Sequence, residues 1–372
     1  MKLTSFGFVA IAENFLKDAL SAPPSTGGKW SLKRFTNFTD NSSSLQVLLT
    51  SDSGEQKTSA LDAGLGAIVD SDTPLYGGLD EIKLTNQTLK KAEALAAKLW
   101  GADYARFSTG GSTHANQAII FALGQPGDKV AVSRTAHRSV LSALVLAGLE
   151  PIWMSPEIDS ATGVPIGIAV TELQSALAEK PIAILLTEPG YLGTISDLPA
   201  LIKVAHQEKV PVILDAAWGG HFGFHPQLPQ HAFQMGADAL ITSTHKALPG
   251  YSASALLLAR TELLSAERLE QSFETTHTTS PAGAPLASID GVRALLETRG
   301  EELLGQLLEN IHRFKETVQA EFALPIFLYP SDFPAGRFDP SKLVLRVQQL
   351  GASGVDIEED LQQQGIRVEM AD

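Results

Sequence analysis

Short apolar segments alternate with amphipathic segments through the middle of this 372-residue chain, and this alternation most constrains its fold. The apolar segments predict strands at residues 104–109, 129–133, 151–154, 182–187, 210–214, 237–241 and 254–259. The amphipathic segments predict helices at residues 85–100, 112–123, 138–147, 171–179 and 198–208. Strands that are apolar throughout are typical of a mostly parallel sheet with helices on both faces. The fold class is therefore α/β, and functional residues are expected where the strands end.

The N-terminal part of the chain lacks this alternation. Residues 21–60 are rich in Ser, Thr, Gly, Pro and Asn, and we expect an irregular N-terminal arm over residues 1–70. Within the arm, a short amphipathic helix is expected at 6–20 and one strand at 45–50. The sheet domain is expected to span residues 71–322.

The C-terminal part also departs from the alternation. Residues 284–300 and 301–322 predict two long helices that leave the sheet. Residues 323–372 are expected to form part of a small α+β domain. Its predicted elements are strands at 326–328, 343–347 and 367–369 and a helix at 357–364.

Lys246 follows the strand predicted at 237–241, within the run Thr242-Ser243-Thr244-His245-Lys246. A lysine is usually solvated on the surface, so its position behind hydroxyls and an imidazole at a strand end is unusual. This arrangement suits a phosphorylated aldehyde such as pyridoxal phosphate, because Lys246 can form an imine while Ser243 and His245 bind phosphate. A lysine in a salt bridge at a strand end explains the same residues.

Polar residues follow three other predicted strands. The run 110–114, Gly-Gly-Ser-Thr-His, lies at the start of a predicted helix, whose free N–H groups could bind an anion. A serine N-cap after a glycine turn would explain the same residues. His137 could stack on a flat ring or play an ordinary packing role. Asp215 could keep a pyridine nitrogen protonated or cap a turn. A helical segment expected at 230–235 separates Asp215 from Lys246, which places both on different strands facing one crevice.

Composition narrows the classes of partner. The net charge of −14 argues against a nucleic-acid partner, and the lack of cysteines excludes disulfides and thiolate ligands. No apolar run reaches the length of a membrane span, so we expect a cytoplasmic protein without membrane contact. His221 and His225 have the spacing of a metal pair on a helix, but Gly223 and Pro226 argue against a helix there. We therefore expect no metal.

The order and spacing of these motifs resemble the bacterial ornithine/lysine/arginine decarboxylases, a pyridoxal-phosphate family with an aspartate-aminotransferase-like fold. The similarity runs from about residue 75 to residue 372. The segments that carry it are Gly78-Leu79-Asp80, Gly110-Gly111-Ser112-Thr113, Pro126-Gly127-Asp128-Lys129, Ala136-His137-Arg138-Ser139-Val140, Glu188-Pro189-Gly190-Tyr191-Leu192-Gly193-Thr194, Asp215-Ala216-Ala217-Trp218, His221-Phe222-Gly223-Phe224-His225, Ser243-Thr244-His245-Lys246, Thr279-Ser280-Pro281 and Val368-Glu369-Met370-Ala371-Asp372.

The resemblance implies a role for each candidate residue. Lys246 is implied to hold the cofactor, Asp215 to contact the ring nitrogen and His137 to stack on the ring. Either His245 or Lys246 is implied to return a proton to the substrate. The residues implied around the phosphate are Ser112, Thr113, His114, Ser243 and His245, and those implied beside the ring are Ala217 and Trp218. Ser280 looks like a residue that reaches the phosphate of a neighbouring subunit, which implies a homodimer with shared active sites.

The activity that the resemblance implies is decarboxylation of ornithine, lysine or arginine to the amines of polyamine metabolism. Another reaction of the same cofactor, such as transamination, stays open. So does a non-catalytic, cofactor-binding paralogue that dimerises with a full-length enzyme. The chain departs from the family at Ala253, where a glutamine is usual, and at residues 83–87. It also has no counterpart of the family's N-terminal Pro-Gly-His-Lys segment in its first 70 residues, and we expect only part of the family's C-terminal domain in the sequence to residue 372.

Overall fold

The computed structural model of the protein describes residues 88–160, 162–322, 325–347 and 351–371. The helix predicted at 6–20 and the strand predicted at 45–50 therefore lie outside the described residues. The boundaries predicted for the arm, the sheet domain and the C-terminal part stay predictions.

The described elements follow the predicted alternation closely. The helices are α5 (Thr88–Trp100), α6 (Gly111–Leu123), α7 (Arg138–Ala147), α8 (Val170–Leu177), α9 (Leu198–Gln207), α10 (Ala266–Thr276), α11 (Gly283–Gln319) and α12 (Gly354–Gln363), with a 3-10 turn, η2, at Pro330–Asp332. The strands are β1 (Tyr104–Ser108), β2 (Lys129–Ser133), β3 (Glu150–Met154), β4 (Glu157–Ile158), β5 (Pro165–Gly167), β6 (Ile184–Thr187), β7 (Val212–Asp215), β8 (Ala239–Ser243) and β9 (Ala255–Ala259).

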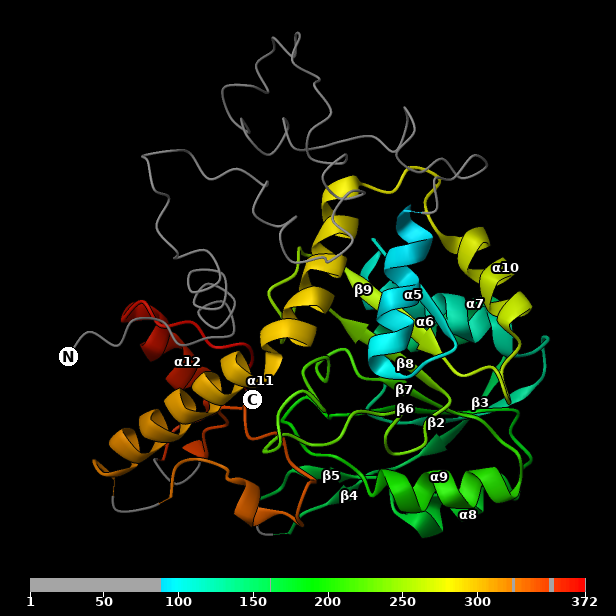
Figure 1. The fold of residues 1–372 in the computed structure, drawn as a ribbon. Helices are drawn as coiled ribbons and strands as arrows, with labels where there is room; N and C mark the ends of the chain where they lie inside the picture. Colours follow the sequence, from blue (N-terminus) through cyan, green and yellow to red (C-terminus); the bar gives the residue numbers. More distant parts are fainter. Residues whose placement is uncertain (1–87, 161, 323–324, 348–350, 372) are drawn as a thin grey trace, which may run out of the picture.

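Seven of these strands form one sheet in the order β1-β9-β8-β7-β6-β2-β3, and β4 pairs with β5 in a separate small ribbon (Figure 1). The pairs β2–β3, β2–β6, β6–β7 and β7–β8 are parallel. Only β9 runs against both of its neighbours, β1 and β8, within this sheet. The mostly parallel α/β sheet predicted from the sequence is therefore confirmed.

Alternate residues of each central strand face opposite apolar layers. In β7, Val212 and Leu214 pack in the layer that contains α5, α8, α9 and the first half of α11. Ile213, between them, packs in the layer that contains α6, α7 and α10. Because both faces are covered, every residue of a central strand can be apolar, which explains the uninterrupted hydrophobic runs in the sequence.

The carboxyl ends of six strands meet at one edge of the sheet. β3, β2, β6, β7 and β8 are parallel, and β1 runs in the same direction as β8 because both are antiparallel to β9. The order of the strands also changes between β6 and β2, and such a change in an open α/β sheet leaves a crevice at the carboxyl edge. The candidate functional residues follow these strand ends.

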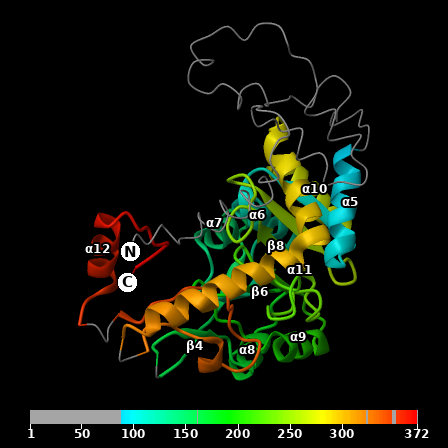
Figure 2. The same ribbon diagram turned by 60° about the vertical axis from the view of Figure 1, so that its left-hand side comes forward.

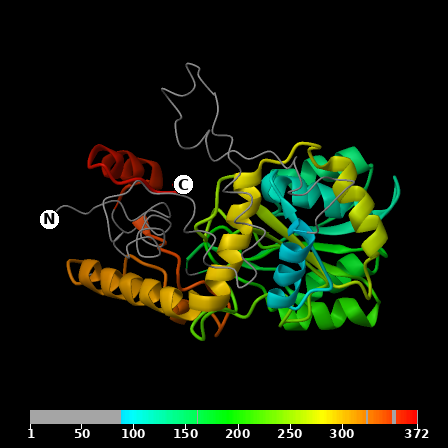
Figure 3. The same cartoon turned by 45° about the horizontal axis from the view of Figure 1, so that its top comes forward.

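Helix α11 corrects the prediction of two helices divided at Gly300. It is one continuous helix of 37 residues, Gly283–Gln319, and is about 55 Å long at 1.5 Å per residue. A glycine inside a helix costs only about 1 kcal/mol. Apolar burial on both sides of Gly300, at Leu296 and Leu303, outweighs that cost. Figure 2 shows α11 running from the sheet layers to the C-terminal elements, and in Figure 3 its far end lies on the same side as α12.

Other differences from the predicted elements concern short segments. Residues 230–235 form hydrogen-bonded turns instead of a helix, because too few residues lie between Pro229 and Gly236 to offset the cost of starting a helix. Helix α10 was not predicted, although Ser265 caps its first turn and Leu269 and Phe273 bury one face. The strands predicted at 326–328 and 343–347 reduce to a single bridge between Phe327 and Leu345, and residues 367–369 form no strand. Among the described helices, none is both long and apolar enough to cross a membrane.

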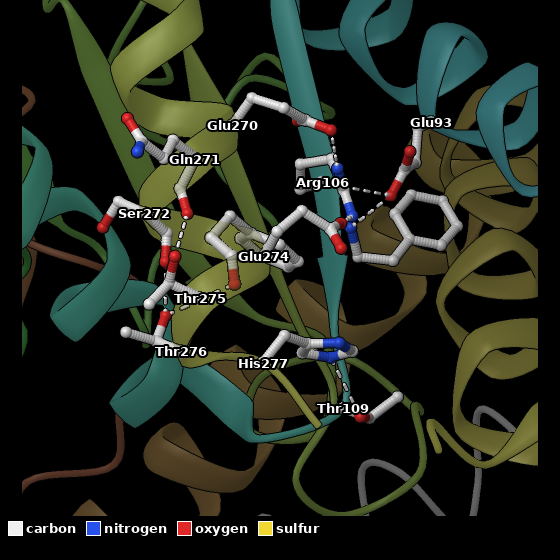
Figure 4. Close-up of polar contacts among 12 residues, drawn as sticks. Glu93, Arg106, Thr109, Glu270, Gln271, Ser272, Glu274, Thr275, Thr276 and His277 are labelled. Atoms are coloured by element: carbon white, nitrogen blue, oxygen red, sulfur yellow. Dashed lines mark hydrogen bonds and ion pairs between the residues drawn. The ribbon is translucent and has the colours of Figure 1, made fainter. Parts of the chain in front are cut away.

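Arg106 of strand β1 connects helices from the two opposite layers (Figure 4). Its guanidinium makes ion pairs with Glu270 and Glu274 of α10 and, at 3.2 Å, with Glu93 of α5. Glu93 also accepts a hydrogen bond of 2.9 Å from the backbone N–H of Phe107. The side chain of Arg106 is only 15 % exposed, so this cluster ties the two layers together across a partly buried strand at the edge of the sheet.

Burial raises the pKa of Glu93 to about 7, although the charge of Arg106 and the Phe107 N–H both lower it. A carboxyl group whose pKa is higher in the folded state than in the unfolded chain stabilises the fold while it is protonated. This contribution is complete below the unfolded pKa of 4.5 and is lost as the pH rises through about 7.

We therefore predict that Glu93→Gln, which keeps an acceptor for the Phe107 N–H but cannot ionise, does not lose unfolding free energy in this way as the pH rises. Between pH 5 and pH 8 the native chain should lose up to about 3 kcal/mol of unfolding free energy relative to the variant. Urea denaturation across this pH range measures the difference. Glu301→Gln, at an exposed position of α11, serves as the control and should follow the native chain. Parallel pH curves for the native chain and Glu93→Gln would contradict the prediction.

Candidate active site

Lys246 lies in a tight turn immediately after strand β8. The Gly250 N–H donates to the Thr244 carbonyl at 2.6 Å, and a Cβ on Gly250 would come within 2.3 Å of that same oxygen, so the turn requires glycine. The turn places Lys246 Nζ 4.8 Å from the centre of the Trp218 ring. Burial lowers the pKa of Lys246, against the charges of Asp215 and Glu369, which raise it. Lys246 is thus a partly buried amine that loses its proton more readily than a surface lysine does.

Asp215 is the last residue of β7, the strand beside β8, and it is almost completely buried. Asn116 Nδ2 donates to its Oδ2 at 2.8 Å, and the Ala217 N–H donates to its Oδ1 at 3.2 Å. Burial raises the pKa of Asp215, while the Asn116 hydrogen bond and the charge of Lys246 lower it. Asp215 and Lys246 thus follow different strands of one sheet, as expected, and these strands are neighbours. That both residues face one crevice stays a prediction.

His137 is the N-cap of helix α7, just beyond strand β2. Its Nδ1 accepts a hydrogen bond from the Ser139 N–H at 3.2 Å and lies 2.8 Å from Ser139 Oγ. The ring is therefore fixed by the start of its own helix, at the same edge of the sheet as Asp215. Ser139 and Asn116 link His137 to Asp215 through hydrogen bonds.

The start of helix α6 and the end of strand β8 meet at a pair of serines. Ser112 Oγ lies 2.7 Å from Ser243 Oγ, and both residues are buried. Gly111, the first residue of α6, has a φ of +67°, a left-handed conformation that suits glycine. The N–H groups in the first turn of a helix have no carbonyl partner within it, so this turn offers donors to an anion.

The ring of His114 faces helix α10. Its Nδ1 lies 2.8 Å from Ser108 Oγ, and its Nε2 lies 3.0 Å from Thr276 Oγ1. Burial lowers the pKa of His114 to about 4. Both ring nitrogens thus face hydroxyl groups, and the backbone N–H of His114 donates to the Gly110 carbonyl at 3.4 Å.

His245 has a fixed tautomer. Its Nδ1 lies 2.8 Å from the carbonyl oxygen of Ser254, and because a carbonyl only accepts, Nδ1 must carry the proton. Burial lowers the pKa of His245, although the hydrogen bond to Ser254 raises it. When the ring is neutral, Nε2 therefore holds the lone pair next to Lys246.

The remaining candidates are placed differently. Ala217 is buried and Trp218 is partly buried in the turn after β7. Thr113 and Ser280 are both exposed, and Ser280 N donates to Thr278 Oγ1 at 3.2 Å. The roles assigned to all these residues stay predictions. His221 Nε2 faces Asp339 and Ser341, at 3.3 and 3.1 Å. In the part of the chain that the structure describes, no three potential ligands gather around one metal position.

Sequence reasoning missed three residues near Lys246. Lys342 Nζ lies 4.1 Å from the centre of the Trp218 ring, so two lysines contact the same indole. Burial lowers the pKa of Lys342 to about 8, and the charges of Asp339 and Glu369 raise it. Tyr191 Oη donates to Glu369 Oε1 at 3.1 Å. Tyr191 and Glu369 lie in two of the segments that resemble the family, 188–194 and 368–372. Their positions in the sequence do not show that the two side chains are in contact in the fold.

Sequence reasoning also left Asn116 and Ser139 without a role. Asn116 is four residues after Ser112 in α6, so both lie on one helix face, and this spacing could have identified it. Asn116 Nδ2 donates to Ser139 Oγ at 3.0 Å as well as to Asp215.

The residues present fit pyridoxal phosphate. An aldehyde needs an amine that is readily deprotonated, which Lys246 supplies, and a pyridine nitrogen needs a buried carboxylate, which Asp215 supplies. The phosphate needs hydroxyl and N–H donors, which Ser112, Ser243 and the first turn of α6 supply.

The chain is similar to several known proteins. The Orn/Lys/Arg decarboxylase family, major domain, matches residues 68–331. The arginine decarboxylase of Bacillus subtilis is 35% identical over 302 residues, which cover 79% of this chain and 61% of that protein. The lysine decarboxylase of Pseudomonas aeruginosa is 26% identical over 256 residues, which cover 62% of this chain and 34% of that protein.

Solved structures share the fold. The constitutive lysine decarboxylase of Escherichia coli superimposes with a TM-score of 0.68 at 18% identity, over 97% of this chain and 56% of that one. This chain thus spans about three fifths of the length of the first curated relatives it matches. The match of the family over most of the sheet domain, together with the 35% identity, shows that the chain belongs to the Orn/Lys/Arg decarboxylase family.

Proposed function

We propose that this protein catalyses the pyridoxal-phosphate-dependent decarboxylation of a basic amino acid. The observation that carries the proposal is the pairing of Lys246 with Asp215 at the ends of adjacent parallel strands, where each charge acts on the pKa of the other group. Membership of the family supports it. So do the names of relatives, which are arginine decarboxylase in Bacillus subtilis and lysine decarboxylase in Pseudomonas aeruginosa.

Pyridoxal phosphate, when bound, supplies an electron sink for the pair of electrons that the departing carboxylate leaves behind. Asp215 is assigned to the ring nitrogen, where its negative charge holds a proton on that atom. His137 is assigned to one side of the ring, and Ala217 and Trp218 are assigned to the other. Ser112, Thr113, His114, Ser243 and His245 are assigned to the phosphate.

The chain offers two groups that could return a proton to the α-carbon. Lys246 has a lowered pKa, so it exchanges its proton at modest cost. His245 carries its proton on Nδ1, toward Ser254, and must take up a second proton on Nε2 before it can act as an acid. This favours Lys246 as the acid, with His245 holding the adjacent turn through Ser254.

Glu369 is assigned to the distal cation of the substrate. Its charge raises the pKa of both Lys246 and Lys342, which places the carboxylate near the two amines. The hydrogen bond from Tyr191 orients it, and its exposure leaves it open to a substrate that arrives from solvent. The proposed substrate is therefore an amino acid that places its α-amino group near Lys246 and pairs a cationic side chain with Glu369.

A homodimer with shared active sites is also proposed. Ser280 is exposed, as a residue that reaches into a neighbouring subunit must be. Helix α7, which His137 caps, exposes Leu141, Val145 and Leu146, by 41%, 80% and 70%. Apolar side chains grouped next to the site are typical of a surface that another chain covers.

The first prediction tests the cofactor site. Pyridoxal phosphate added to the protein and fixed with borohydride should label Lys246, as mass spectrometry of the digested chain would show. Lys246→Ala should lose the label, whereas Lys342→Ala, which removes the other lysine on the Trp218 indole, should keep it on Lys246. A label on Lys342, or none at all, would refute the assignment.

Chromatography of the same preparation with arginine, lysine and ornithine identifies the reaction. Carbon dioxide and the corresponding amine are expected from one of the three, and Lys246→Ala should form neither. A keto acid in place of the amine would show transamination instead.

The second prediction concerns Glu369. Replacing it with Gln removes a charge-assisted contact worth about 1.5–3 kcal/mol, so KM for the basic substrate should rise by about tenfold or more. Inhibition by norleucine, which lacks the distal cation, should stay unchanged. Glu359→Gln, at an exposed position of α12, is the matched control and should leave KM as it is. An unchanged KM in Glu369→Gln would assign the distal group elsewhere.

The third prediction is that the protein in solution has twice the mass of one chain. Light scattering coupled to size-exclusion chromatography measures the mass. Val145→Lys, which places a charge in the exposed apolar group of α7, should shift the protein toward the single-chain mass. A single-chain mass for the unmodified protein would exclude the shared site.

A further inference from the structure

Asn116 lies between two residues that the proposed function places around the cofactor ring. Its Nδ2 donates to Asp215 Oδ2 at 2.8 Å and to Ser139 Oγ at 3.0 Å. Ser139 Oγ is in turn 2.8 Å from His137 Nδ1. A continuous chain of hydrogen bonds therefore runs from His137 through Ser139 and Asn116 to Asp215, across the starts of helices α6 and α7 and the end of strand β7.

The direction of each hydrogen bond in this chain follows from the chemistry of the groups. The Ser139 N–H donates to His137 Nδ1, so that nitrogen holds a lone pair and the Ser139 hydroxyl must also donate to it. Ser139 Oγ then accepts one Asn116 N–H, and an ionised Asp215 accepts the other. The neutral His137 ring consequently carries its proton on Nε2.

The orientation of the Asn116 amide fits this direction. Asn116 is completely buried, and its Oδ1 has no hydrogen-bond partner among the residues that the structure describes. Turning the amide over would place Oδ1 against the Asp215 carboxylate, and two acceptors repel each other. The site thus uses Asn116 for its two donors.

We propose that Asn116 is a positioning residue that orients the Asp215 carboxylate for the ring nitrogen and couples it to the orientation of His137. The proposal rests on the proposed function, because it needs a cofactor whose ring nitrogen meets Asp215. The Ala217 N–H holds Oδ1 of the carboxylate and Asn116 holds Oδ2, so both oxygens are fixed. Without Asn116 the buried carboxylate keeps a single backbone donor, and its protonated form, which cannot stabilise a charged ring nitrogen, becomes favoured.

The test compares two ligands that differ only at the ring nitrogen. One is pyridoxal phosphate, and the other is its analogue with a C–H group in place of that nitrogen. The dissociation constants of both are measured on the full chain by fluorescence titration. The native protein should prefer pyridoxal phosphate, because only this ligand has a nitrogen for Asp215.

Asn116→Asp has the same shape but replaces the donors with acceptors. We expect the dissociation constant of pyridoxal phosphate to rise by about tenfold or more, the change that one lost charge-assisted hydrogen bond produces. The dissociation constant of the analogue should rise by less than about twofold. Ser139→Ala is the matched control: it cuts the branch to His137, leaves the contact between Asn116 and Asp215, and should keep the preference for pyridoxal phosphate. If Asn116→Asp does not fold, Asn116→Ala removes the same donors without adding charge, and the same loss of preference is expected.

Equal weakening of both ligands in the Asn116 variants would show a role in packing alone and would overturn the proposal. Unchanged binding of both would also overturn it. A native chain that binds neither ligand would refute the proposed function itself. A native chain that binds both equally would overturn the assignment of Asp215 to the ring nitrogen and this proposal with it.

Discussion

A carboxylate at the end of a buried strand is the constraint on which the rest of the site depends. Asp215 is 3% exposed, and a charge taken so far out of water must be matched by donors and opposite charge. The donors come from the adjacent turn and from helix α6, and the opposite charge comes from Lys246 in the turn after the next strand. The sheet order that brings β7 beside β8 is therefore also what makes a charged group tolerable in the core.

The same constraint explains why the site is formed from strand ends. Side chains within the central strands are surrounded by apolar layers on both faces, so a polar group there would lack partners. At the carboxyl edge the backbone turns away, and glycines such as Gly111 and Gly250 allow tight approaches that bring hydroxyl, amide and amine groups together. Six strands end at this edge, so the short segments that follow them can bring residues from distant parts of the chain together.

The sheet and the centre of the site could be predicted from the sequence, because both depend on local patterns. Uninterrupted apolar runs fixed the strands, and the polar residues directly after them, Asp215 and Lys246, fell where parallel strands end. Helix α11 was divided wrongly, since a glycine is a weak local signal and burial over a long range decides whether a helix continues. Helix α10 was missed although Ser265 gives a capping signal, because only two buried residues, Leu269 and Phe273, mark its apolar face.

The residues proposed to contact the substrate could not be predicted in the same way. Tyr191 and Glu369 are 178 residues apart and meet only in the folded chain. Lys342 joins them through its contact with the Trp218 ring, and a lone lysine in a loop carries no sequence signal. Asn116 could have been identified from the sequence, because its spacing from Ser112 places both residues on one helix face. Its partner Ser139 lies on another helix, so only the structure shows the link to His137.

The pair formed by Ser112 and Ser243 has a consequence for how the chain acquires its ligand. The two serines are 131 positions apart, and the segment between them contains four strands of the main sheet, β2, β3, β6 and β7, and most of a fifth, β8, which ends at Ser243. The phosphate site proposed for these two serines cannot exist in a partly folded intermediate that lacks the centre of the sheet. A ligand that binds there therefore stabilises only the assembled molecule, in proportion to the logarithm of its free concentration. The supply of that ligand in the cell thus becomes one of the quantities that set how much of the chain survives in its folded form.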